Sequence, residues 1–197
     1  MTPAHEFRTG RIDRETIVTV ALRLLDEWGF PDLTMRRLAG ELGVQPSALY
    51  WHFENKQALL AAVAERIVSA AKPSAVPEDP ALIARALRTA VLAHRDGAEV
   101  VMSTYALTFG AGEASAALRR AFAAHSPARD ADLATAAVLQ FLLGNATVLQ
   151  QRLDAVRLGA VTADANAVQV ASDAEFALGL AALVRGVVQP GVPPSGI

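Results

Sequence analysis

The 197-residue sequence contains no cysteine, and aromatic residues make up only 6% of it. Without thiols the chain can form no disulfide, has no thiol nucleophile and offers no cysteine ligands for zinc. It also lacks a glycine-rich phosphate loop, a convincing strand pattern and a repeat with a period of about 20 to 50 residues. These absences leave a reduced protein without obvious nucleotide chemistry, and they fit the cytoplasm.

An excess of basic charge is missing as well. The formal net charge is −2, and residues 1–66 contain eight basic side chains against nine acidic ones. A nucleic-acid-binding domain usually shows a basic footprint, and composition alone does not provide one here. Basic side chains gather only locally, before the first expected helix and around the central motif: Arg8, Arg11, Arg14, Arg36, Arg37 and Lys56.

A hydrophobic leader is not evident either. The first ten residues, MTPAHEFRTG, contain no apolar run, so we expect no signal peptide. The most apolar long stretch, 131–149, contains Asp132, Gln140 and Asn145, which favours a buried helix over a membrane span. We therefore expect a cytoplasmic protein without a membrane partner.

What the chain does have is the material for a helical core. Hydrophobic residues make up 52% of the sequence and charged residues 19%. Alanine, leucine and valine dominate, which favours helices over sheets and predicts an all-α fold.

Residues 33–56, LTMRRLAGELGVQPSALYWHFENK, are the motif around which the chain is organised. Thr34 suits an N-cap, and apolar residues at helical spacing lead to Gly43, which suits a helix C-terminus. Pro46 favours the first turn of a second helix, whose inward positions are Leu49 and Phe53. The rest of that helix is polar and aromatic, as in a helix-turn-helix whose second helix enters the major groove of DNA.

Lys56 has two explanations at this stage. Asn55 can cap the next helix, which places Lys56 in the first turn, where a cation opposes the helix dipole. A DNA phosphate would compensate, but a solvated lysine lying along the surface explains the residue equally well.

Prolines mark the clearest boundary in the chain. Segment 72–80, KPSAVPEDP, contains three of them. It predicts a DNA-binding domain at 11–72, preceded by a flexible arm at 1–10, and a second domain at 78–189, followed by a disordered tail at 190–197.

Capping residues and apolar periodicity predict the helices. Asp13 caps the first one, and the helix over 55–71 links the two domains mechanically. Ser172, with Glu175 at the capping-box position, is expected to begin the last helix. The expected helices cover 13–28, 55–71, 81–94, 98–109, 113–124, 130–153 and 172–187 beside the two short ones, with a loop over 157–169.

The segments LTMRRLAGELGV, LYWHF and ENKQALL resemble the DNA-binding domain of the TetR family of bacterial repressors, over about 12–68. The resemblance implies a homodimer with an N-terminal three-helix helix-turn-helix domain and a helical-bundle domain for ligand binding and dimerisation. It implies a repressor released from a palindromic double-stranded DNA operator by a small effector, and no cofactor. By the same resemblance the DNA contacts are Thr34, Arg36, Gln45, Pro46, Ser47, Tyr50, Trp51, His52 and Lys56.

Four of these residues are expected nearest the bases. Arginine reads guanine and glutamine reads adenine through paired hydrogen bonds, which favours Arg36 and Gln45. Ser47 and Tyr50 join them. Trp51, His52 and Lys56 are expected to hold phosphates.

The second domain resembles the tetracycline repressor subfamily through HRDGAEVV and FLLGNATVL. That subfamily has a metal-binding histidine where this chain has Val101, and an acidic residue near the position of Val148. Because Mg²⁺ requires oxygen ligands, we predict no metal and a largely apolar effector of unknown identity instead of magnesium–tetracycline. The resemblance places a pocket among Val101, Thr104, Tyr105, Phe109, Phe122, Leu139 and Leu143, and a filled core is the alternative for each of them.

Two stretches of the second domain, 133–149 and 176–188, are too apolar for a monomer surface. A second copy of the chain is the simplest partner for them. Small residues such as Ala177, Gly179 and Ala181 allow close approach. The predicted interface consists of Ala137, Gly144, Val148, Phe176, Leu180 and Leu183.

The sequence offers partial support for two other functions. His94, Asp96 and Glu99 are possible acids and bases, but they gather at a turn without a nucleophile or metal spacing, so we expect no enzyme. The weak basic charge favours a non-DNA-binding adaptor that kept the fold. Arg36, Tyr50 and Lys56 together favour DNA, and a steep salt dependence of binding would distinguish the two functions.

Overall fold

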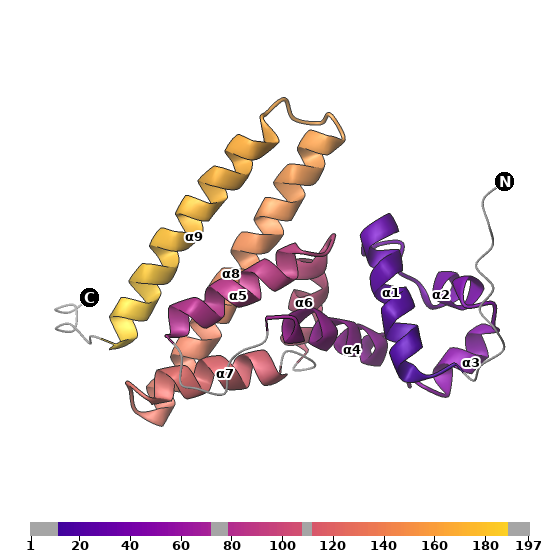
Figure 1. Ribbon diagram of the computed structural model, residues 1–197, viewed down its shortest axis with the longest axis horizontal. Helices are drawn as coiled ribbons and strands as arrows, with labels where there is room; N and C mark the ends of the chain where they lie inside the picture. Colours follow the sequence, from indigo (N-terminus) through magenta and orange to yellow (C-terminus); the bar gives the residue numbers. More distant parts are fainter. Residues whose placement is uncertain (1–11, 72–78, 108–111, 189–197) are drawn as a thin grey trace.

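The computed structural model describes residues 12–71, 79–107 and 112–188, and this part of the chain forms nine α helices without a strand (Figure 1). The all-α prediction is confirmed. The helices are α1 (Arg14–Trp28), α2 (Met35–Glu41), α3 (Pro46–Tyr50), α4 (Lys56–Ser69), α5 (Pro80–Leu92), α6 (Gly97–Ala106), α7 (Gly112–Ala123), α8 (Ala128–Arg157) and α9 (Ala165–Val188).

Three of the first four helices, α1, α2 and α4, begin where polar side chains cap them, whereas α3 begins with Pro46 and has no side-chain cap. The carboxylate of Asp13 accepts from the Thr16 amide at 2.8 Å, and the hydroxyl of Thr34 accepts from the Arg37 amide at 3.1 Å. The Asn55 side chain does the same at the start of α4. Side chains that satisfy free first-turn amides stabilise a helix start, so the expected caps at Asp13, Thr34 and Asn55 are confirmed.

Helices α5 to α9 form the bundle. In Figure 1, α8 and α9 make a long antiparallel hairpin that extends beyond the shorter helices, and α4 reaches from the helix-turn-helix into the bundle. One buried apolar cluster runs from Ile17 in α1 to Leu180 in α9. The helix-turn-helix and the bundle therefore share a core. Most of the predicted boundary, the arm and the tail lie outside the described residues.

The end of α8 and the start of α9 differ from the prediction. The loop expected over 157–169 is much shorter, because α8 continues to Arg157 and α9 already begins at Ala165. Ser172 is not an N-cap. It lies inside α9 with 2% of its surface exposed. The spacing of Ser172 and Glu175 imitates a capping box, but the serine hydroxyl has a tertiary partner instead.

That partner is the buried Arg88 of α5. Its Nε donates to Asn145 Oδ1 at 2.9 Å, its Nη1 to Asp173 Oδ1 at 2.6 Å and its Nη2 to Ser172 Oγ at 3.1 Å. The guanidinium also lies 4.7 Å from the centre of the Phe176 ring. A buried charge needs such partners, and these bind α5, α8 and α9 together.

Glycine allows α8 and α9 to approach within one protomer. A Cβ atom built on Gly179 would lie 2.3 Å from the Phe141 ring, which stacks on Phe176 with ring centres 5.7 Å apart. The sequence analysis assigned Gly179 to the contact between two copies, and this assignment is wrong, because the ring of the same chain occupies the space.

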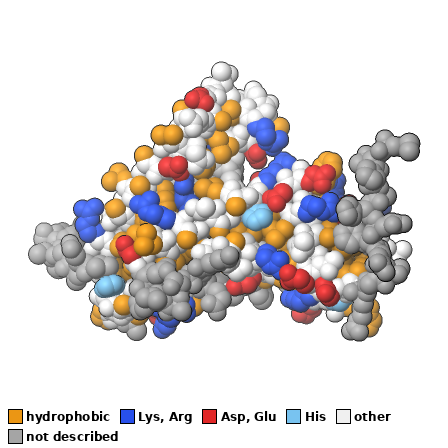
Figure 2. All heavy atoms as spheres, viewed as in Figure 1, with side chains coloured by type: hydrophobic (Ala, Val, Ile, Leu, Met, Phe, Trp, Pro, Cys, Tyr) orange, Lys and Arg blue, Asp and Glu red, His pale blue; other side chains and the backbone are white. Residues whose placement is uncertain are grey.

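Both hairpin helices are long and apolar enough to cross a membrane by length and composition, which is weak evidence. In their most apolar windows, 44% of α8 and 17% of α9 is buried inside the protomer. Figure 2 shows hydrophobic side chains interspersed with charged ones over this part of the surface.

Candidate DNA-binding surface and its link to the bundle

Helix α3 presents one face to solvent and anchors itself with the other. Leu49 and Phe53 are buried, with at most 1% of their surface exposed, as the sequence predicts. On the outside, Tyr50 is 52% and Trp51 89% exposed. Of the other predicted contact residues, His52 and Lys56 are half-buried, and the exposed ones are Thr34, Arg36, Gln45, Pro46 and Ser47.

The basic side chains near this face differ in their surroundings. Arg37 Nη2 lies 3.2 Å from Asp32, and its guanidinium lies 4.8 Å from the Trp28 ring centre. Lys56 Nζ lies 5.5 Å from the Phe30 ring centre. Arg36 is exposed and has no hydrogen bond or ion pair with any described residue. Arg36 is therefore the side chain most available to an external anion.

Arg14 connects the start of α1 to the end of the recognition segment. Its Nη1 donates to the His52 carbonyl oxygen at 2.6 Å, and its guanidinium lies 4.1 Å from the Phe53 ring centre. Arg14, one of the local basic residues around the motif, therefore holds the segment just after α3 against the start of α1.

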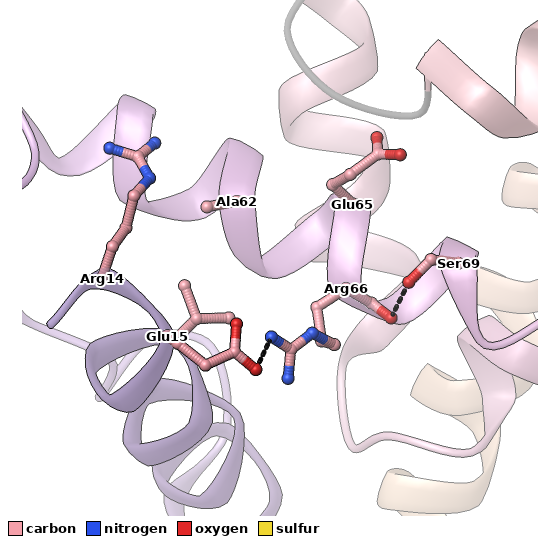
Figure 3. A pocket seen from close by; sticks show the side chains of 7 residues that line it. Arg14, Glu15, Ala62, Glu65, Arg66 and Ser69 are labelled. Atoms are coloured by element: carbon pink, nitrogen blue, oxygen red, sulfur yellow. Dashed lines mark hydrogen bonds and ion pairs between the residues drawn. The ribbon is translucent and has the colours of Figure 1, made fainter.

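A groove of about 510 Å³ lies beside it, between α1 and α4 (Figure 3). Charges of both signs line it, and Glu15 forms an ion pair with Arg66 across the two helices. Ser69 Oγ donates to the Arg66 carbonyl oxygen at 3.0 Å. Because the Glu15–Arg66 ion pair bridges the two helices, it helps to hold α1 against α4.

The end of α1 binds the turn between α5 and α6. His94 Nδ1 lies 3.1 Å from both carboxylate oxygens of Asp26, and the Arg95 amide donates to Asp26 at 3.1 Å. In return, Asp96 Oδ2 accepts from the Phe30 amide at 2.8 Å. Gly29, with φ of +86°, is needed here, because a Cβ would lie 2.7 Å from the Asp96 carboxylate.

The same turn is held from the other side by α8. Gln150 Nε2 donates to the His94 carbonyl oxygen at 2.7 Å, and its Oε1 accepts from the Ala98 amide at 3.2 Å. The sequence showed only a turn at Asp96–Gly97. It missed Asp26 and Gln150, because no local pattern indicates a hydrogen bond between residues so far apart along the chain.

The predicted pocket is mostly filled core. Five of its members have at most 3% of their surface exposed: Val101, Thr104, Phe122, Leu139 and Leu143. Phe109 lies outside the described residues. Tyr105 is half-buried and borders an open cleft between α6, α7 and α8. The described residues contain no group of three histidine or acidic side chains suited to a metal ion.

The predicted interface residues range from buried to exposed in the protomer. Phe176 and Leu180 are buried within the protomer, so a second copy cannot reach them. Gly144 and Leu183 are half-buried, and Ala137 and Val148 are exposed. Leu133 (61%) and Leu178 (74%), which belong to the predicted stretches but not to the named residues, are more exposed than Val148, as is Val170 (61%) outside those stretches.

Comparison with known proteins identifies this architecture. Residues 17–63 match the family model described as bacterial regulatory proteins, tetR family. Over 201 residues the chain is 35% identical to the class A tetracycline repressor from transposon 1721 of Escherichia coli, covering 91% of this chain and 92% of that protein. The chain belongs to the TetR family. It is a DNA-binding transcriptional repressor of that family, one member of which, ActR of Streptomyces coelicolor, has been solved in complex with (S)-DNPA.

Two solved structures are similar over most of the chain. BioQ in complex with its natural double-stranded DNA operator superposes with a TM-score of 0.76 at 36% identity, covering 90% of this chain and 99% of that one. A TetR variant from Acinetobacter baumannii AYE in complex with minocycline gives 0.69 at 31% identity, covering 89% and 96%.

Proposed function

We propose that this TetR-family repressor binds a palindromic double-stranded operator as a homodimer and is released by a small molecule. The observation that carries the DNA-binding surface is the exposed pair Tyr50 and Trp51 above the buried Leu49 and Phe53. A side chain as large as tryptophan is rarely so exposed without a partner. Exposed Arg36 beside this pair can supply direct contacts to bases or phosphates.

The outer face of the α8–α9 hairpin supports the homodimer. Leu133 and Val148 of α8, with Val170 and Leu178 of α9, are large apolar side chains left open in the protomer. A two-fold partner presenting the same face would cover them, since isologous contacts close after two copies. We therefore place the interface on these residues together with Ala137 and Gly144.

Regulation would act on the spacing of the two recognition helices. Successive major grooves lie about 34–36 Å apart, so a dimer binds only when its two α3 helices match that distance. Two links reach the DNA-binding part from the bundle: helix α4 and the α5–α6 turn held by Asp26 and Gln150. An effector that favours another arrangement would lower DNA affinity about 5- to 150-fold, the usual range of allosteric coupling.

The effector we infer is largely apolar and needs no metal or other cofactor. Val101 is 2% exposed within the core, so neither ligand chemistry nor access for Mg²⁺ exists at the position where related repressors have a histidine. We also infer a non-enzymatic role in the cytoplasm. His94 and Asp96 serve the contact between α1 and the bundle, which leaves them no free catalytic role.

Binding of the purified chain to the DNA upstream of its own gene, titrated with salt, tests this function. We expect a tight complex whose affinity falls steeply with salt, because phosphate contacts release counterions. Tyr50→Ala and Lys56→Ala should weaken it, and Lys56→Ala should lower the salt slope by about one. Arg120→Ala, which removes a charge from the bundle, is the control. If no variant differs from the wild type and binding is absent at low salt, the adaptor function replaces this proposal.

A further inference from the structure

An open cleft of about 630 Å³ is lined by residues of α6, α7 and α8. Its size falls within the usual range for small-molecule sites, about 300–1,000 Å³. Small residues, among them Ala106, Gly112 and Ala116, keep it open. It lies outside the buried positions at which the sequence analysis placed the effector, since of those residues only Tyr105 borders it among the described lining residues.

The polar side chains of this cleft can all donate hydrogen bonds. Tyr105 and Ser115 supply hydroxyls, Gln140 an amide and Arg119 a guanidinium. Arg119 carries the only formal charge among the described residues that line the cleft. A site with several donors and one cation suits a ligand that carries an anionic acceptor group, such as a carboxylate.

Arg119 is only partly occupied within the protein. Its Nε lies 2.6 Å from Asp132 Oδ1, and its remaining N–H groups bond to no other described residue. The ion pair is more than half exposed on both sides. Exposed ion pairs contribute about 0–1 kcal/mol, so a ligand anion can compete with Asp132 at little cost.

We propose that this cleft binds the effector through an anionic group held by Arg119, with an apolar body lying among the small residues. This inference rests on the proposed function, because it names the chemistry of the effector. Binding there would replace the ion pair between Arg119 of α7 and Asp132 of α8 with an ion pair between Arg119 and the ligand. Since α8 carries Gln150, which holds the α5–α6 turn, the exchange occurs on a helix that reaches the DNA-binding part.

Two matched fluorescent probes test the proposal: 1-pyrenebutyrate, which carries a carboxylate, and uncharged 1-pyrenebutanol. We expect the full-length chain to bind the carboxylate at least about tenfold tighter than the alcohol, a difference of about 1.4 kcal/mol. Arg119→Gln should remove this preference, and Asp132→Asn should increase it by freeing the guanidinium. Arg120→Gln changes the same charge one residue away, outside the described lining, and should keep the preference.

Equal binding of the two probes by the wild type would overturn the proposal, as would an equal loss of preference in the two arginine variants. Thermal unfolding of each variant checks that the fold is intact. Operator binding is measured separately without probe. If the wild-type chain binds no DNA, the proposed function is refuted. The comparison of the two probes still tests whether the cleft prefers a carboxylate. Saturating pyrenebutyrate that leaves operator binding of the wild type unchanged would refute an effector role for the cleft.

Discussion

Arg36 and Arg37 are neighbours in the sequence but have different surroundings in the structure. Arg37 pairs with Asp32 and covers the Trp28 ring, whereas Arg36 extends into solvent without a described partner. The sequence analysis placed only Arg36 in the DNA contacts, by resemblance. The Trp28 ring itself is 47% exposed, with the Arg37 guanidinium above it.

We predict that Arg36→Ala weakens operator binding and leaves thermal stability unchanged. Arg37→Ala should instead lower stability by about 0.5–1 kcal/mol, because it removes the cation–π contact with Trp28. Fluorescence anisotropy with labelled operator and thermal unfolding of both variants measure the two effects. Equal loss of DNA affinity in both variants would contradict the division of roles.

Two carboxyl groups give opposite pH dependences of stability. Burial, with a smaller contribution from Asp96, raises the pKa of Glu99 above 4.5. The folded state therefore holds the Glu99 proton more tightly than the unfolded state, and its contribution to stability is lost as pH rises through the folded pKa. The hydrogen bond from the Thr16 amide lowers the pKa of Asp13 below 3.8, so its contribution is present above pH 3.8 and lost below it as Asp13 protonates.

We predict from this that Glu99→Gln raises stability at neutral pH and flattens the profile just above pH 4.5. Asp13→Asn should flatten the profile below pH 3.8 instead. Urea unfolding across pH 3 to 7 measures both. A wild-type-like profile for Glu99→Gln would show that the Glu99 carboxyl is not desolvated in the folded protein.

At the scale of elements, the α8–α9 hairpin depends on contacts that sequence periodicity does not show. Arg88 binds Ser172 and Asp173, and this pairing belongs to the interior of a long α9. In the sequence, Ser172 lies three residues before Glu175, a spacing that predicts a helix start. Ser172 lies in the interior of α9 instead because α5, which carries Arg88, packs beside it.

Glycines in α9 give a direct test of this packing. Gly179→Ala should destabilise the protein by about 1–3 kcal/mol, because its new methyl group meets the Phe141 ring. Gly186→Ala is the matched control in the same helix, where a Cβ meets nothing within 4 Å, and it should stabilise by about 0.5–1 kcal/mol. Chemical denaturation compares the two. Similar effects of both substitutions would place Phe141 elsewhere.

At the scale of the whole molecule, the α5–α6 turn connects the bundle to the end of α1. Asp26 accepts from both His94 and Arg95, so Asp26→Ala should free this connection. We predict faster amide hydrogen exchange at residues 94–97 and operator binding weakened several-fold, because the two α3 helices are held less firmly. Asp32→Ala removes the same charge without touching the turn and should change neither exchange there nor the connection. Unchanged exchange in Asp26→Ala would leave α4 as the main link.

The sequence by itself determined the helix-turn-helix, because its signals are local. Caps at Asp13, Thr34 and Asn55 act within one turn of each helix, and the inward positions Leu49 and Phe53 follow from helical periodicity. In the bundle, only the tertiary structure decided which side of each helix is buried in the protomer. Apolar residues there surround the helices on several sides, so the pattern cannot say which side faces a neighbour, a cleft or a second copy. That is why Leu139 and Phe176 were assigned to a pocket and an interface, although both lie in the protomer core.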